Sequence, residues 1–342
     1  MSVRAIARLL AISPTAVSLA LKDSPRVSPR LKDRIREQAR ALGYIPNAKL
    51  AELMGEVRRS SVPVYRATLG AFSFYPAEAP WCERPYLKHL FDGAVKCAAS
   101  HGYKLEYLWY LRPGMTPMRF RKILETRGIQ GLFCLGSLEP DQSFPPELRK
   151  FAVTTFSVSV PGPLHRVSSH FTYDARLLFD ELLRRGYRRP GLCILVHGDR
   201  RTDYAYSATY LSTSERHLSP PHPPVLRADT WDEASFHHWF TAHRPDVIVL
   251  HQFPAYIAGV EAYLKTARLR VPRDIGLALL DLNPDRLRYS GICQNTSLMG
   301  ATAIELLIGR ILMRDFQAPA HPKVELVIGE WNEGRTLRSI AK

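Results

Sequence analysis

The chain has 342 residues, 46% apolar and 23% charged, the composition of a globular protein with a sizeable core. Its net charge is +15, and residues 1–61 hold twelve Lys or Arg against five Asp or Glu, so basic charge is concentrated there. The five cysteines are widely spaced without a CxxC pair, which argues against a metal site or a disulfide framework. No apolar run approaches the roughly 18 residues of a membrane span, and no signal-peptide pattern opens the chain. We expect a cytoplasmic protein of two or three domains, with no metal, cofactor or membrane partner.

Residues 1–46 are predicted to form three short helices. Ser13 caps the second helix and Pro14 opens it, and Ser28 and Pro29 do the same for the third, because serine accepts a free N–H and proline lacks one. Apolar residues recur at helical spacing along one side of each helix. The other side of the third helix carries Arg30, Lys32, Arg34, Arg36 and Arg40. A plain three-helix bundle would explain the periodicity but not this charge, so the pattern favours a helix-turn-helix domain that binds DNA.

This segment resembles the headpiece of the LacI/GalR (lactose/galactose repressor) family of bacterial transcription regulators. The similarity extends over VRAIARLLAISPTAVSLAL and VSPRLKDRIREQARALGYIPNAKLAELMG, and GYIPN at Gly43–Asn47 matches the family pattern in full. The reading helix departs from the family. Residues 16–19 are Ala-Val-Ser-Leu where Thr-Val-Ser-Arg is usual, Lys22 stands where Asn is usual, and Ala11 replaces the turn glycine. The fold expectation survives these departures, whereas the family's usual operator sequence is not expected.

The resemblance implies a homodimer that places its two second helices in successive major grooves of a near-palindromic DNA operator. In the helix-turn-helix domain, the residues expected at the DNA are Ser13, Pro14, Thr15, Ser18, Leu19, Lys22 and Arg30. Residues 47–61 are expected to form a hinge helix and linker, with Asn47, Leu50 and Leu53 at the DNA. By alignment, Leu53 is the leucine that the family wedges between base pairs in the minor groove. The alternative is a plain linker whose Leu50 and Leu53 pack on the core.

From residue 62 onward strands and helices alternate, which predicts parallel sheets with helices on both faces. The expected strands are 66–74, 104–111, 131–134, 152–158, 191–196, 247–250, 275–281 and 324–328, and the expected helices are 86–100, 116–127, 174–185, 207–214, 231–243, 256–267 and 296–313. Two such sets indicate two lobes with a ligand cleft at the carboxyl ends of the strands. The family fold implies an α/β core of the type I periplasmic-binding-protein kind over residues 62–342. Its lobe 1 would comprise about 62–165 and 295–320, and lobe 2 about 166–294 and 321–342.

Polar residues at strand ends are the candidates for binding a small-molecule effector. Asp281 ends the strand IGLALLD and could accept hydrogen bonds from sugar hydroxyls or a purine edge. Gln294 lies in ICQNTSLMG, which resembles a family segment, and Tyr206 takes the place of the family's effector-binding arginine. Trp231 could stack on a ring, although each of these residues alone could also be merely a solvated strand end. The full candidate set is Ser73, Tyr75, Tyr206, Trp231, His251, Gln252, Asp281 and Gln294.

The expected function is a sequence-specific transcription regulator, most simply a repressor, whose operator affinity changes with a small-molecule effector such as a sugar or related metabolite. The alternative is a cytoplasmic solute-binding protein or an α/β enzyme domain with a structural helical N-terminus. None of the motifs GxSxG, HExxH, GxxxxGK and GxGxxG occurs, and no catalytic residue is proposed.

Overall fold

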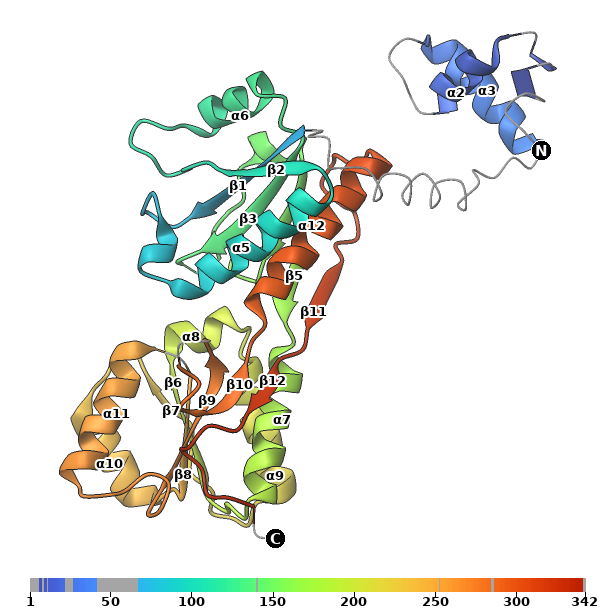
Figure 1. Cartoon of the computed structure of the whole chain (residues 1–342). Helices are drawn as coiled ribbons and strands as arrows, with labels where there is room; N and C mark the ends of the chain where they lie inside the picture. Colours follow the sequence, from blue (N-terminus) through green and yellow to red (C-terminus); the bar gives the residue numbers. More distant parts are fainter. Residues whose placement is uncertain are drawn as a thin grey trace. The chain divides into compact units, whose positions relative to one another are not determined.

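The computed structural model describes residues 6–7, 9–10, 12–21, 27–41, 67–139, 141–251, 253–283 and 286–340. Contacts divide the chain into two compact units, Met1–Pro63 and Val64–Lys342. The first contains the helices α2 (Pro14–Leu21) and α3 (Pro29–Ala41), labelled in Figure 1. As predicted, α2 starts at Pro14, and the Ser13 Oγ atom accepts a hydrogen bond from the Ala16 N–H at 3.1 Å. Its core consists of Ile6, Ala7, Val17, Ala20, Val27, Ile35 and Ala39.

The first lobe of the larger unit is built on a six-stranded sheet of order β11-β5-β4-β3-β1-β2, in which neighbouring strands pair in parallel. Its strands are β1 (Ala67–Phe74), β2 (Tyr103–Tyr107), β3 (Gly131–Ser137), β4 (Ala152–Phe156), β5 (His165–Ser169) and β11 (Val324–Val327). The helices α5 (Pro85–Ser100) and α12 (Thr296–Met313) cover one face, and the short 3-10 helix η1 (Pro80–Cys82) packs beside α5. On the other face lies α6 (Pro117–Thr126), which the short 3-10 helix η2 (Pro146–Leu148) contacts; the helices α5, α6 and α12 are labelled in Figure 1. Each face therefore has its own apolar core, as a buried parallel sheet requires.

The second lobe has a six-stranded sheet of order β12-β10-β9-β8-β6-β7. Its elements are α7 (Phe171–Arg184), β6 (Pro190–Leu195), α8 (Val196–Arg201), α9 (Ala205–His217), β7 (Leu226–Ala228), α10 (Glu233–His243), β8 (Val247–Leu250), α11 (Pro254–Thr266), β9 (Gly276–Leu282), β10 (Ser290–Cys293) and β12 (Glu330–Asn332). One apolar core lies between the sheet and α7 with α9, and the other between the sheet and α10 with α11. The neighbouring strands of this sheet pair in parallel as predicted, except that the edge strand β12 runs antiparallel to β10.

The lobe boundaries expected from the sequence also need correction. Both β5 and β11 belong to the first sheet, whereas residues 166–169 and 321–328 were expected in lobe 2. The chain crosses between the lobes after β5, after β10 and after β11, and α12 returns to the first lobe as expected. Residues 324–328 were also expected to be the last strand, yet β12 follows them.

Close contact between α5 and α12 depends on two glycines. A Cβ atom on Gly300 would lie 1.9 Å from the carbonyl oxygen of Leu90, and one on Gly93 would lie 2.0 Å from that of Ser297. These neighbours are backbone atoms, which cannot turn aside as a side chain can. Only glycine lets the two helices approach this closely.

The sequence-based statement that no apolar run reaches membrane-spanning length is wrong for α12. Thr296–Met313 has 18 residues with a hydropathy of 1.4, which is enough by length and composition. In this fold the helix packs on α5 and on strands β3, β4 and β5, and Met299, Ile304 and Leu307 are fully buried. The apolar character of α12 is therefore explained by its place in the core of the first lobe.

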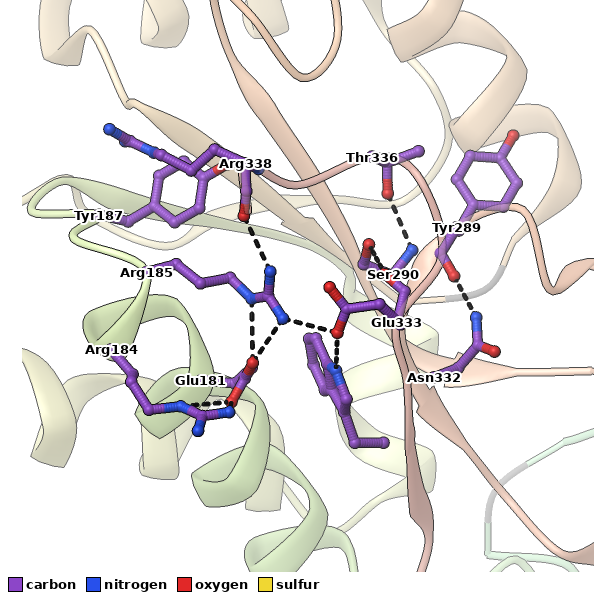
Figure 2. Close-up of polar contacts among 11 residues, drawn as sticks. Glu181, Arg184, Arg185, Tyr187, Tyr289, Ser290, Asn332, Glu333, Thr336 and Arg338 are labelled. Atoms are coloured by element: carbon purple, nitrogen blue, oxygen red, sulfur yellow. Dashed lines mark hydrogen bonds and ion pairs between the residues drawn. The ribbon is translucent and has the colours of Figure 1, made fainter. Parts of the chain in front are cut away.

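The last described residues are held to lobe 2 by a polar network around Arg185 (Figure 2). The Arg185 guanidinium donates to a Glu181 carboxylate oxygen at 2.6 Å, to Glu333 at 2.6 Å and to the carbonyl oxygen of Arg338 at 2.8 Å. The Arg185 side chain is 2% exposed and that of Glu181 7% exposed. Arg184 pairs with the same Glu181, but its side chain is 62% exposed. The buried pair of Arg185 with Glu181 lies at the end of α7, and the same guanidinium holds the segment that follows β12 through Glu333 and the Arg338 carbonyl.

Candidate functional site

Two regions carry the residues expected to bind partners, and the first is the headpiece. Arg30 and Arg34 of α3 are exposed, while Lys32 and Arg36 are partly exposed. Leu19 is half-buried and packs against the headpiece core, so it is less available than an outward-facing reading residue was expected to be. Lys22, Asn47, Leu50 and Leu53 lie outside the described residues, as do the side chains of Pro14, Thr15 and Ser18.

The second region lies where the two lobes meet. Parallel strands bring their carboxyl ends to one edge of a sheet. In lobe 2 this edge carries His251 directly after β8, Asp281 near the end of β9 and Gln294 directly after β10. In lobe 1 the corresponding residues are Ser73 in β1, Tyr75 just after it, and Ser137 at the end of β3.

The lobe 2 residues form a polar cluster in which Tyr206 is buried and His251, Asp281 and Gln294 are half-buried, so the structure brings together four residues selected from the sequence. Gln294 Nε2 donates to the hydroxyl of Tyr206 at 3.0 Å. Burial raises the pKa of Tyr206 well above its ordinary value, and the nearby carboxylate of Asp281 adds to the effect. The Nε2 atom of His251 lies 3.4 Å from an Asp281 carboxylate oxygen. Gln252, expected beside His251, lies outside the described residues.

His251 is neutral in this environment. Burial, with the Arg201 cation adding to the effect, lowers the pKa of its imidazole to about 3. The contact with Asp281 is therefore one between a neutral ring and a carboxylate rather than an ion pair, with the ring proton assigned to Nε2, which faces the carboxylate. The other nitrogen, Nδ1, is buried and has no hydrogen-bond partner. It is an unused acceptor at the base of this cluster.

The lobe 1 residues are less accessible than the sequence suggests. Ser73 is fully buried, and its hydroxyl is 2.8 Å from that of Tyr107. The Tyr75 hydroxyl is 2.8 Å from that of Tyr86, and burial raises the pKa of Tyr86. Tyr75 reaches the lobe interface with its hydroxyl, whereas Ser73 is taken up by a contact inside lobe 1.

Trp231 does not belong to this site. Its ring lies 5.2 Å from that of Phe236 and 5.1 Å from that of Tyr256, measured between ring centres. A Cβ atom on Gly259 would lie 2.3 Å from the Trp231 ring. The expectation that Trp231 stacks on a ligand ring is wrong, because the indole already packs on the side of lobe 2 that α10 and α11 cover.

Sequence reasoning missed Arg201, a residue of lobe 2 that forms hydrogen bonds with lobe 1. Arg201 ends α8, and its Nη1 atom donates to the carbonyl oxygens of Ser137 at 2.6 Å and Leu138 at 2.7 Å. Its Nη2 atom donates to the Tyr75 hydroxyl at 3.3 Å. The preceding residue, Arg200, pairs with Asp141 of lobe 1 at 2.9 Å. The only signal in the sequence is the pair of arginines shortly after a buried strand.

No metal centre is found in the part of the chain that the structure describes, since no three His, Cys, Asp or Glu side chains gather there closely enough to hold an ion. All five cysteines are free, and Cys97, Cys134 and Cys193 are buried.

Comparison with known proteins identifies this architecture. Residues 179–337 match the family model described as the periplasmic binding protein-like domain. The body of the chain has the periplasmic-binding-protein-like fold. We find no match to this chain among curated protein sequences.

Solved structures with this periplasmic-binding-protein-like body include transcription regulators. The transcriptional regulator CelR in complex with cellobiose is similar with a TM-score of 0.60 at 18% identity, over 98% of this chain and 99% of that chain. The lac repressor dimer bound to operator and the anti-inducer ONPF gives a TM-score of 0.56 at 16% identity, over 97% of each chain. A LacI family regulator from Enterococcus faecium with bound ribose gives 0.57 at 14% identity, over 80% of this chain and 100% of that chain. At these identities the likeness is one of fold.

Proposed function

We propose that this chain is a transcription regulator of the LacI type, a cytoplasmic homodimer that binds a near-palindromic DNA operator. The observation that carries the proposal is the headpiece. The helix α2 opens with a serine cap and Pro14, and the neighbouring α3 exposes Arg30 and Arg34. Helix-turn-helix domains place such a second helix in the major groove, and exposed arginines provide the phosphate contacts that dominate affinity.

The body supports the regulatory half of the proposal. Similar structures were solved with cellobiose and with ribose, and in this chain Tyr206, His251, Asp281 and Gln294 meet in one cluster at the carboxyl ends of the lobe 2 strands. We propose that an effector, a sugar or related metabolite, binds between the lobes and changes how they close. In this proposal residues 47–61 pass that change to the DNA, with Leu53 as the minor-groove wedge.

Unbiased selection of duplex DNA by the full-length protein tests the proposal. We expect a near-palindromic motif and an affinity that falls on the order of a thousandfold between low and moderate salt, if six or more phosphates are neutralised. The variant Leu19→Arg should move one selected position per half-site toward G/C, since arginine pairs with guanine and leucine contacts only a thymine methyl. Arg216→Ala, an exposed change on α9, is the control and should leave the motif unchanged.

Two results would count against this function. A monomeric protein that selects no duplex sequence at low ionic strength would instead match a solute-binding protein. A motif that is identical for the parent and for Leu19→Arg would mean that position 19 of α2 does not read the bases.

A further inference from the structure

The lobe interface contains a cation with neutral partners. Arg201 donates to two carbonyl oxygens and one phenol, all of them uncharged. Within the described ranges no carboxylate forms an ion pair with Arg201, and Glu139 acts on it only at longer range. Its neighbour Arg200 differs, because it is paired with Asp141. Arg201 thus connects lobe 2 to lobe 1 through hydrogen bonds, and none of the groups that accept those bonds carries a negative charge.

The hydrogen bonds from the Arg201 guanidinium to neutral carbonyl oxygens are already charge-assisted through the donor. A carboxylate or phosphate adds direct attraction between opposite charges, and it can accept two parallel hydrogen bonds from one guanidinium. An anionic group that reached the interface would therefore compete well for Arg201 with Ser137 and Leu138. A neutral sugar hydroxyl would offer no such advantage over two carbonyl oxygens.

A second observation points to the same place. Gly198 of α8 lies against His251, since a Cβ atom on Gly198 would be 2.9 Å from the unpartnered Nδ1 atom. The same short helix thus covers this acceptor and carries Arg201. A shift of α8 that released Arg201 from lobe 1 would also uncover Nδ1, which could then accept a hydrogen bond from a ligand hydroxyl.

We propose that Arg201 is a latch between the lobes, and that the interface takes a small hydroxylated anion whose carboxylate or phosphate group binds the guanidinium in place of the Ser137 and Leu138 carbonyls. Calling this anion an effector rests on the proposed function, whereas the proposed binding site does not depend on that function. The shared chemistry is a sugar acid or a sugar phosphate.

The binding test compares the thermal-unfolding midpoint of the full-length protein with glucose, gluconate and glucose 6-phosphate at matched ionic strength. We expect one or both anions to raise the midpoint and glucose to have little effect; the two anions distinguish a carboxylate from a phosphate ligand. Arg201→Gln should weaken anion binding roughly tenfold or more, because hydrogen bonds to a charged group are lost. Arg200→Gln, which removes only an exposed ion pair, should change it by less than about twofold.

Hydrogen exchange of residues 196–201 tests the latch without any ligand. Exchange should be faster in Arg201→Gln than in Arg200→Gln, since α8 loses its contacts with lobe 1. Equal exchange in the two variants would refute the latch. Equal midpoint shifts with glucose and the anions, no shift with either anion, or undiminished anion binding by Arg201→Gln would refute the anion site. Failure of the duplex selection would reject the regulator function and leave both of these results standing.

Discussion

The network around Arg185 makes the sharpest prediction about stability. Arg185 and Glu181 are both nearly inaccessible, with side chains 2% and 7% exposed. Replacing Arg185 by Met keeps most of the volume and leaves the Glu181 carboxylate buried without this partner. Breaking a buried ion pair in this way costs about 3–5 kcal/mol, and we expect Arg185→Met to lower the free energy of unfolding by that amount.

Arg184 provides a matched control on the same helix. It pairs with the same carboxylate, but its side chain is 62% exposed. Exposed ion pairs contribute about 0.2–1 kcal/mol, so Arg184→Met should cost no more than that. Urea unfolding, followed by circular dichroism and by tryptophan fluorescence, measures both variants.

The reasoning would be refuted if Arg185→Met cost less than about 1 kcal/mol, or if the two variants were equally destabilised. A double variant separates the charge from the packing. Arg185→Met combined with Glu181→Leu removes both charges, and it should be more stable than Arg185→Met alone because no buried carboxylate is left without its buried partner.

Two further predictions concern α12 and the lobe crossing. Gly300→Ala should lower the free energy of unfolding by at least about 3 kcal/mol, the upper end for overpacking, because the added Cβ would meet the carbonyl oxygen of Leu90. Gly309→Ala on the same helix has open space around it and should instead raise the free energy of unfolding by about 0.5–1 kcal/mol. The same urea assay measures both variants. Equal effects of the two changes would contradict the close packing of α5 on α12. At the lobe crossing, Asp174 of α7 accepts a hydrogen bond from the Gly329 N–H, between β11 and β12, at 2.8 Å. Burial raises the pKa of Asp174 to about 6, so its contribution to the parent's stability should fall as pH rises from about 4 to about 6. The stability of Asp174→Asn relative to the parent should therefore rise by up to about 3 kcal/mol over that range. A difference between parent and variant that does not change with pH would show that Asp174 is not held neutral by the fold.

The long elements of the body could be predicted from the sequence because their signals are local. The helix 296–313 was predicted with its observed bounds. Its first turn is capped by the Asn295 side chain, and Arg314 beyond its end takes the left-handed conformation. Apolar residues recur at helical spacing over its whole length, and this pattern predicts a helix. The helix-turn-helix start at Ser13 was likewise predicted from a cap and a proline.

Short elements were missed for a physical reason. The strands β5, β7, β10 and β12 and the helix α8 have three to six residues each, too few for a periodic pattern to stand out. β5 reads His-Arg-Val-Ser-Ser and is buried throughout, which its polar composition does not suggest.

The candidate site divides in the same way. Asp281 and Gln294 could be selected because they follow recognisable strands or motifs, and the structure places both in the polar cluster. Arg201 could not be selected, because its partners are backbone carbonyls more than sixty positions earlier in the chain. Every residue has a backbone carbonyl, so the sequence does not indicate which of them accept a hydrogen bond from a side chain. Trp231 was selected only because its ring could stack on a ligand, and an aromatic ring can equally well pack against other rings in a core, as it does here.

The order of the strands also has a consequence for synthesis. The first sheet includes β11 and the second includes β12, and both are made after almost all of the chain. A ribosome delivers the N-terminus first, so the small helical unit can fold early, while each lobe has to wait with one sheet edge open until translation is nearly finished. A premature stop shortly before Val324 would therefore remove an edge strand from both lobes at once.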